Sequence, residues 1–189
     1  MRFGVGMIAA VVLAGALSGC AGVPKVVDPS GVDLSLSRLT ERQMLALYGA
    51  GTDDDPNPYV TPGSLLSSSD AEYIVLRLDV VAARRALISL NEVTARDDSG
   101  KQLATLYTWP DFKAWLKSWS MDDKVLNIEY VKAESSYIPG MDFQVGVGRR
   151  SYYLVLIGKR PIPKPCTVLG SFSIDSDTTK NFTVEVPKS

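Results

Sequence analysis

Much of the chain alternates apolar and polar residues with a period of two. The clearest case is residues 72–82, where every second residue from Ile74 to Val80 is apolar. Alternation of this kind puts one set of side chains on each face of a β-strand, so it predicts a half-buried strand. The run at 152–157 is apolar on both faces, which predicts a central strand. Comparable patterns predict further strands at residues 86–95, 101–107, 124–132, 167–174 and 181–186.

Turn residues separate several of these strands. Aspartate and serine gather at 97–100 and at 175–178, which predicts tight turns. The first three strands then predict a meander. Gly146 and Gly148 predict a hairpin turn rather than a phosphate-binding loop, because no third glycine and no helical pattern follow them.

Two segments carry helical signals. Thr40 and Gln43 have the spacing of a capping box, and a glycine six residues later marks a stop, which predicts a short helix. Thr108 and Asp111 repeat the capping spacing. A proline follows Trp109, as is common at helix starts, so we expect a second helix over residues 110–119, inserted between strands.

Six or seven short strands and two short helices indicate a mainly β fold. The strand spacing resembles that of an immunoglobulin-like antiparallel β-sandwich, although the cysteine–tryptophan–cysteine signature of that family is absent. The resemblance implies an architecture and no particular function. We expect residues 36–189 to form this sandwich as a single domain, since their number is typical of one domain.

The first twenty residues have the pattern of an export signal. Arg2 precedes an apolar run from Phe3 to Leu17, and small residues follow. The run is shorter than the roughly 20 apolar residues of a membrane-spanning helix, so it predicts a signal peptide over residues 1–19. An ordinary secretory signal, with Cys20 as a structural thiol, is the alternative.

The segment Leu17-Ser18-Gly19-Cys20 is similar to the lipobox of bacterial lipoproteins. In that family the chain is cut before the cysteine and its thiol is acylated, so the resemblance implies that Cys20 carries acyl chains such as palmitate. It also implies a lipid-anchored location in the bacterial cell envelope. Because Ala21 is not acidic, this is the outer membrane if the cell has one. Residues 20–35 are then expected to be the lipidated N-terminus and a linker.

Composition narrows the possible chemistry. The formal net charge is −1 without a basic cluster, so we expect no nucleic-acid partner. The chain has no histidine, which removes the commonest general base and zinc ligand. We therefore expect no catalytic residues, no cofactor and no enzyme activity. Neighbouring aspartates, as at 53–55, 97–98 and 122–123, stand beside turn residues, which leaves a carboxylate-based enzyme as a remote alternative.

The chain has two cysteines, and they have different expected roles. If Cys20 is acylated, Cys166 has no partner for a disulfide within the chain. A lone cysteine is most often a small buried apolar residue, and we expect burial for Cys166. A free, cross-linking thiol is the alternative.

Residues 49–69 are rich in glycine, proline, serine and aspartate, which predicts a long loop. Asp53, Asp55 and Asn57 have the alternating oxygen spacing of a calcium loop. Pro58 stands where an EF-hand has glycine, and Ser64 stands where it has a bidentate glutamate, so the EF-hand is excluded. We expect a solvated acidic turn without a metal, with a weak calcium site as the alternative.

All three tryptophans, Trp109, Trp115 and Trp119, lie in the segment from Thr108 to Trp119 that contains the second predicted helix. Two of them join Phe112 and Leu116 at helical spacing, which makes one face strongly apolar. We expect this face to close one end of the sandwich as part of the core. The alternative is a partly exposed platform in which Trp109, Trp115 and Trp119 bind a glycan, a peptide or a partner protein.

Together these patterns favour a binding role at a membrane. We expect a membrane-anchored extracytoplasmic lipoprotein, held through the lipid on Cys20, that acts as a structural or protein-interaction subunit with an envelope protein as its partner. The alternative is a module that binds a small ligand, a glycan or a peptide. The first predicts a large patch that only a partner buries, and the second predicts a pocket near the tryptophans.

Overall fold

The computed structural model describes residues 28–52, 54–60, 63–64, 67–68, 70–119 and 123–188. These residues form one large antiparallel sheet, one two-stranded ribbon and three helices. The strands are β1 (Val32–Leu39), β2 (Gly63–Ser64), β3 (Ser67–Ser68), β4 (Ala71–Ala82), β5 (Ala86–Arg96), β6 (Gln102–Tyr107), β7 (Asp142–Val145), β8 (Gly148–Lys159), β9 (Cys166–Ile174) and β10 (Thr178–Val186). The helices are α1 (Glu41–Tyr48), α2 (Trp109–Trp119) and α3 (Asp123–Glu134).

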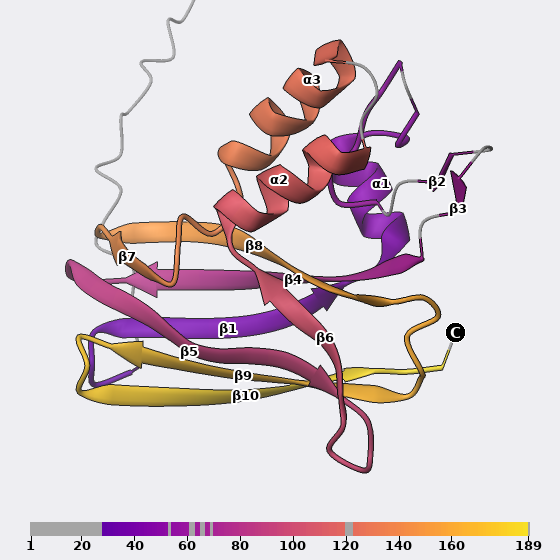
Figure 1. Ribbon diagram of the computed structural model, residues 1–189. Coiled ribbons are helices and arrows are strands. Elements are labelled where there is room, and N and C mark those ends of the chain that lie inside the picture. Colours follow the sequence, from indigo (N-terminus) through magenta and orange to yellow (C-terminus); the bar gives the residue numbers. More distant parts are fainter. Residues whose placement is uncertain are drawn as a thin grey trace, which may run out of the picture.

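The large sheet curls until its two edges approach each other. Its strand order is β1-β4-β8-β6-β5-β9-β10, and β7 pairs with β5 beside this path. The edge strands β1 and β10 lie close together, so the sheet is almost closed (Figure 1). The predicted mainly β, antiparallel, sandwich-like fold is confirmed, with three short helices instead of two.

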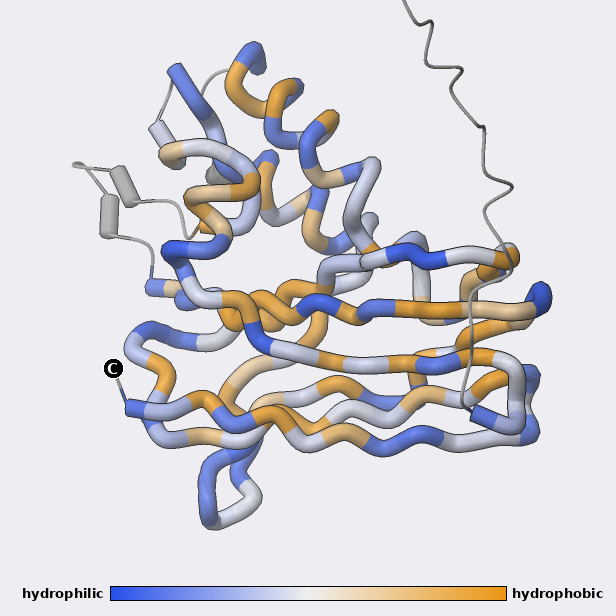
Figure 2. Tube along the Cα trace, turned by 180° about the vertical axis from the view of Figure 1, so that it is seen from behind, coloured by the Kyte–Doolittle hydropathy of each residue, from blue (hydrophilic) through white to orange (hydrophobic). Residues whose placement is uncertain are grey.

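The interior of the curled sheet is apolar because alternate residues of each strand point inward. On β4 and β8, the cross-strand pairs Leu76–Leu154 and Leu78–Tyr152 are buried. Phe172 of β9 is fully buried against them from the other half of the sheet. Figure 2 shows hydrophobic stretches concentrated in the strands and hydrophilic ones in turns such as 97–101. This burial is the main stabilising contribution to the fold.

The three helices cover the outer face of β4, β6 and β8 (Figure 1). Tyr153 and Val155 of β8 point outward and are buried there. The Tyr153 ring lies 5.5 Å from that of Tyr59, and the Val155 amide donates to the Tyr137 hydroxyl at 3.3 Å. β8 is therefore buried on both faces, as its apolar sequence predicts.

The predicted capping box of the first helix is confirmed. Gln43 N donates to Thr40 Oγ1 at 3.3 Å and Thr40 N donates to Gln43 Oε1 at 2.8 Å. α1 then ends at Gly49, whose φ of 109° favours glycine. Before α2, the Thr108 hydroxyl donates to Asp111 Oδ2 at 2.5 Å.

The strand predicted at 124–132 is wrong, because this segment is helix α3. Alternating Leu126, Ile128 and Tyr130 suggested a period of two, but the side chains that the fold buries are Leu126 and Ala133, which are seven residues apart. That spacing is two helical turns. Glu129 interrupts the same face, which weakens the helical pattern.

The expected linker, residues 20–35, is wrong in its last part. Strand β1 begins at Val32 and pairs with β4 along its whole length, from Val32–Ala82 to Leu39–Val75. Pro29 and Gly31 mark only the turn before this strand. The signal peptide and Cys20 lie outside the described residues.

Two predicted connections differ from the structure. β4 pairs with β1 and β8 rather than with β5, so the expected meander is limited to β5 and β6. Gly146 and Gly148 do not close a hairpin, because β7 pairs with β5 while β8 pairs with β4 and β6. Strands that alternate well can still be joined across the sheet, and the pattern alone does not reveal it.

Cys166 is buried and forms no disulfide, as expected. Burial also raises the pKa of its thiol, which makes the thiol less reactive. Within the described residues, no helix is both long enough and apolar enough to cross a membrane.

Candidate functional site

The aromatic face of α2 packs onto the sheet. Phe112 and Leu116 are buried, and the Phe112 ring stacks 5.0 Å from that of Tyr137. Trp109 and Trp115 are partly buried and pack against the same core. The Trp115 indole donates to the Tyr73 hydroxyl at 2.5 Å. This part of the helix therefore serves as core, as the sequence predicts.

These contacts do not show whether the three tryptophans also bind a ligand or a partner. Trp109 and Trp115 keep part of their surface exposed, and the Trp109 ring lies 5.6 Å from that of Tyr137. The side chain of Trp119 lies outside the described part of the chain. Binding of a glycan, a peptide or a partner by these three residues stays a prediction.

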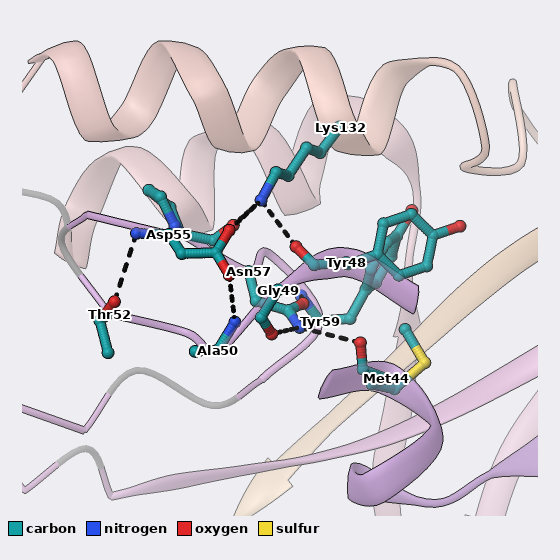
Figure 3. Close-up of polar contacts among 10 residues, drawn as sticks. Met44, Tyr48, Gly49, Ala50, Thr52, Asp55, Asn57, Tyr59 and Lys132 are labelled. Carbon is teal, nitrogen blue, oxygen red and sulfur yellow. Dashed lines mark hydrogen bonds and ion pairs between the residues drawn. The ribbon is translucent and has the colours of Figure 1, made fainter. Parts of the chain in front are cut away.

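The acidic loop after α1 is fixed to α3 by Lys132 (Figure 3). The Lys132 ammonium donates to the carbonyl oxygens of Tyr48 and Pro56, both at 2.6 Å, and pairs with Asp55 at 3.1 Å. The second Asp55 oxygen accepts the amide of Ala50 at 2.7 Å. Hydrogen bonds from Ala50 and Lys132 lower the pKa of Asp55. This contact fixes the end of α1 against the helical layer.

Asn57 completes the same loop from inside. Its buried amide donates to the carbonyls of Met44 at 3.0 Å and Gly49 at 2.8 Å, and its oxygen accepts the Tyr59 amide at 3.0 Å (Figure 3). Asp55 and Asn57 therefore use their oxygens within the protein. Asp53 lies outside the described residues, and the described ones contain no group of three metal-ligating side chains. The contacts of Asp55 and Asn57 therefore support a structural role for this loop.

A cleft opens beside this loop, where α1 follows β1 and where the β8–β9 connection passes the start of β4. Its volume is about 630 Å³. Its exposed lining is more polar than apolar, because charged side chains of both signs surround a smaller apolar and aromatic floor. The lining residues are Arg38, Leu39, Glu41, Met44, Tyr59, Val60, Glu72, Tyr73, Val75, Arg160, Pro161 and Lys164.

One ion pair orders the rim of the cleft. Lys164 Nζ lies 2.6 Å from Glu72 Oε1, and the Ile162 amide donates to the other Glu72 oxygen at 2.8 Å. Burial opposes ionisation of Glu72, but the hydrogen bonds from Lys164 and Ile162 outweigh it and lower its pKa. Glu72 is therefore a negative, satisfied group that holds the β8–β9 connection in place.

Two arginines remain available in the cleft. Arg38, at the end of β1, and Arg160, after β8, form no ion pair within the part of the chain that the structure describes. The charge of Arg160 helps to lower the pKa of Glu72, but neither guanidinium forms an ion pair with a described residue, so both suit a ligand that carries a negative group. The geometry offers recognition rather than a defined pair of reacting groups.

Glu129 of α3 has a raised pKa but does not line this cleft. Its carboxyl group is partly buried, and the loss of solvation raises its pKa to about 7, although the charge of Lys132 opposes the shift. The charge on Glu129 in turn adds to the burial that raises the pKa of Tyr73. Glu129, the carboxyl group with the raised pKa, therefore lies outside the lining of the cleft.

Sequence reasoning missed the cleft because it is built from separate parts of the chain. Arg38 lies near the end of β1, whose first half falls within the expected linker of residues 20–35, and Glu72 lies near the start of β4. The segment 159–165 gave the available signal, because it contains three basic residues and three prolines between two predicted strands. The prolines restrict the backbone of this segment and the basic residues make it cationic, which is typical of an ordered loop at the protein surface.

Comparisons with known proteins give no family for this chain. No protein family matches the sequence, and no curated protein matches it. Among solved structures, the chain is similar to the crystal structure of a FixG-related protein from Vibrio parahaemolyticus, with 11% sequence identity and a TM-score of 0.38. The similarity covers 84% of this chain and 96% of that one.

Proposed function

We propose that this chain is a membrane-anchored extracytoplasmic lipoprotein that acts as a protein-interaction subunit of the bacterial cell envelope. In this proposal the lipid on Cys20 holds the chain on the membrane, and the cleft between α1, β1, β4 and the β8–β9 connection receives a segment of an envelope protein. The observation that carries the proposal is the cleft, in which Arg38 and Arg160 form no ion pair with any described residue.

The positions of anchor and cleft support this division of roles. Asp28, the first described residue, stands eight positions after Cys20, so the intervening chain spans at most roughly 28 Å. Strand β1 starts near Asp28 and ends at the cleft, with Leu39 in its lining. Its eight residues separate the two ends by about 25 Å. A chain anchored at Cys20 would present the cleft away from the membrane.

A small ligand is the second candidate. The cleft volume of about 630 Å³ lies within the range of pockets for small molecules, and its many charged groups favour a polar ligand. A glycan fragment or short peptide with a carboxylate would suit Arg38 and Arg160. This candidate differs from the first in the size of what binds.

Photo-cross-linking in the native cell tests the proposed interaction. A photoreactive amino acid at Glu41, an exposed residue in the cleft lining, is expected to capture an envelope protein, while the same amino acid at exposed Lys117 on α2 is not. Adding Arg38→Gln and Arg160→Gln should reduce the cross-link about tenfold, because complementary charge guides and retains the partner.

The control changes the same number of charges outside the cleft, with Arg42→Gln and Lys117→Gln. Equal cross-linking in both double variants would contradict the proposal. Adducts of a small molecule alone would favour the second candidate. The anchor is tested separately, because the N-terminal peptide from the membrane fraction should carry acyl chains on Cys20, and Cys20→Ser should release the chain from the membrane.

A further inference from the structure

Four segments meet at the end of the sheet opposite the cleft. They are the turn before β1, the β4–β5 turn, the β7–β8 connection and the β9–β10 turn, at the left in Figure 1. The Ala83 amide donates to the Gly31 carbonyl at 2.9 Å, and the Leu87 amide donates to Asp175 at 2.8 Å. Lys180 pairs with Asp28. These contacts make the end one ordered surface, and the chain leaves it toward Cys20.

Three exposed arginines of this surface have no acidic partner. Arg85 stands in the β4–β5 turn, and Arg149 and Arg150 begin β8, where Arg149 lies opposite Val81. None of the three forms an ion pair within the described ranges. Arg150 rests over the Tyr152 ring, 5.5 Å from its centroid. Their charges are therefore available to an external anion.

The other charged groups at this end largely neutralise one another. Arg84 pairs with Asp175 at 2.5 Å, and Lys180 pairs with Asp28. The Asp33 carboxylate accepts the Asp28 amide at 2.9 Å. Exposed Asp177 is a further acid on the β9–β10 turn. Three free arginines against Asp33 and Asp177 leave the surface positive.

An exposed apolar residue stands among the arginines. Val147, at the tip of the β7–β8 connection, is 55% exposed. The segment Gly146 to Arg150 contains no acidic residue. A hollow of about 230 Å³ lies behind it, lined by Val147, Arg149 and Arg150 with their neighbours. An apolar tip flanked by arginines is the arrangement that enters the headgroup region of a membrane.

We propose that this basic end, formed by Arg85, Arg149, Arg150 and Val147, docks on anionic phospholipid headgroups of the membrane that holds Cys20. The inference rests on the lipid anchor of the proposed function. The short chain between Cys20 and Asp28 keeps this end within roughly 28 Å of the anchor. This tether lets the basic end reach the lipid surface, where its positive charges contact negative headgroups and the arginines fix the orientation in which the cleft faces outward.

Vesicle binding measures the headgroup contact without the anchor. The mature chain from residue 20, with Cys20→Ser, should bind vesicles that contain phosphatidylglycerol and not vesicles of phosphatidylcholine alone. Each arginine near an anionic surface strengthens binding about fivefold. The triple variant Arg85→Gln, Arg149→Gln and Arg150→Gln should therefore bind about a hundredfold more weakly.

The matched control removes three exposed positive charges elsewhere, with Arg42→Gln, Lys101→Gln and Lys188→Gln. It should keep binding within about twofold of the parent chain, because these residues lie far from the basic end. Equal loss in both triple variants, or equal binding to both kinds of vesicle, would overturn the inference.

Orientation is measured on the lipidated chain. An environment-sensitive dye on Val147→Cys should shift to the blue and be quenched by lipid-borne quenchers in vesicles with phosphatidylglycerol, while the dye on exposed Lys101→Cys should not. Buried Cys166 does not compete for the label. If Cys20 is acylated but the dye at position 147 stays in water, the inference fails and the anchor stands. If Cys20 is not acylated in cells, the proposed function fails.

Discussion

Glu129 differs from the other shifted carboxyl groups of the chain in the direction of its pKa. Hydrogen bonds from Lys180 and Ser30 lower the pKa of Asp28 to about 2, and similar contacts lower that of Asp55. Glu129 instead loses solvation on α3 without a compensating donor, and its pKa rises to about 7. Folding therefore favours the protonated form of this residue.

Replacing Glu129 with glutamine should stabilise the protein at high pH. The folded state holds more protons than the unfolded state between about pH 4.5 and 7, so the free energy of unfolding falls as the pH rises through this window. Glu129→Gln should gain roughly 1 to 2 kcal/mol at pH 8, after allowance for partial exposure, and almost nothing at pH 4. Urea denaturation at both pH values measures this difference.

The control for this prediction is Glu134→Gln, on the exposed side of the same helix. It should change the free energy of unfolding by no more than a few tenths of a kcal/mol at either pH. A gain from Glu129→Gln that is the same at pH 4 and pH 8 would show that removal of a buried charge is not its cause.

Single residues were predictable where a local rule decides their role. Thr40 and Gln43 form a capping box within four consecutive residues, and the burial of Cys166 follows from a lone cysteine in an apolar strand. The common site of Arg38 and Arg160 was not predictable, because it depends on how β1 and β8 pair with β4. A cleft made by pairing distant strands leaves no local signal in the sequence.

At the scale of elements, two predictions were wrong: the strand expected at residues 124–132 and the linker expected up to residue 35. A partly buried charge explains the first, and turn residues beside a short strand explain the second. In α3, Glu129 occupies a position that a helical pattern expects to be apolar, and polar Asn127 and Glu129 between Leu126, Ile128 and Tyr130 give the apparent alternation. In β1, Leu34 and Leu36 do alternate with polar residues, but nearby Pro29 and Gly31 suggested a linker. The long strands β4, β8 and β9 were predictable because both their faces are clearly patterned.

Helix α2 depends on one aromatic side chain for its attachment to the sheet. Phe112 is fully buried, and its ring lies 5.0 Å from Tyr137, 6.0 Å from Tyr73 and 6.3 Å from Tyr59. These three tyrosines come from the α3–β7 connection, β4 and the loop after α1. Phe112 therefore joins the helical layer to the sheet.

Truncation of Phe112 to alanine should lower the free energy of unfolding by about 3 to 5 kcal/mol, because it leaves a cavity among three tyrosine rings. Urea denaturation followed by tryptophan fluorescence measures the loss, and Trp115 emission should shift to the red as the helix loosens. Leu47→Ala removes a 54% exposed side chain from α1 and should cost less than about 0.5 kcal/mol. A similar cost for both variants would contradict the assigned role.

For the whole molecule, closure of the sheet depends on places where strands approach too closely for a side chain. At Gly170 of β9, a Cβ atom would lie 2.9 Å from Leu36 of β1, across the interior near the open seam. At Gly158 of β8, a Cβ atom would overlap the Leu103 carbonyl oxygen and lie 3.0 Å from Ala104. Gly158 stands where β6 turns the sheet from one half to the other.

Gly158→Ala should therefore destabilise the closed sheet by about 2 to 3 kcal/mol, because backbone atoms of β6 must move to admit one methyl group. Gly146→Ala adds the same methyl group where no atom lies within 4 Å, and it should leave stability unchanged or raise it slightly by restricting the unfolded chain. Thermal and urea unfolding of the two variants compare the sites directly. If both glycines tolerate alanine equally, β6 is free to shift and the corner of the sheet does not limit closure. If only Gly158→Ala loses stability, the close approach of β6 to β8 at Gly158 limits closure of the sheet.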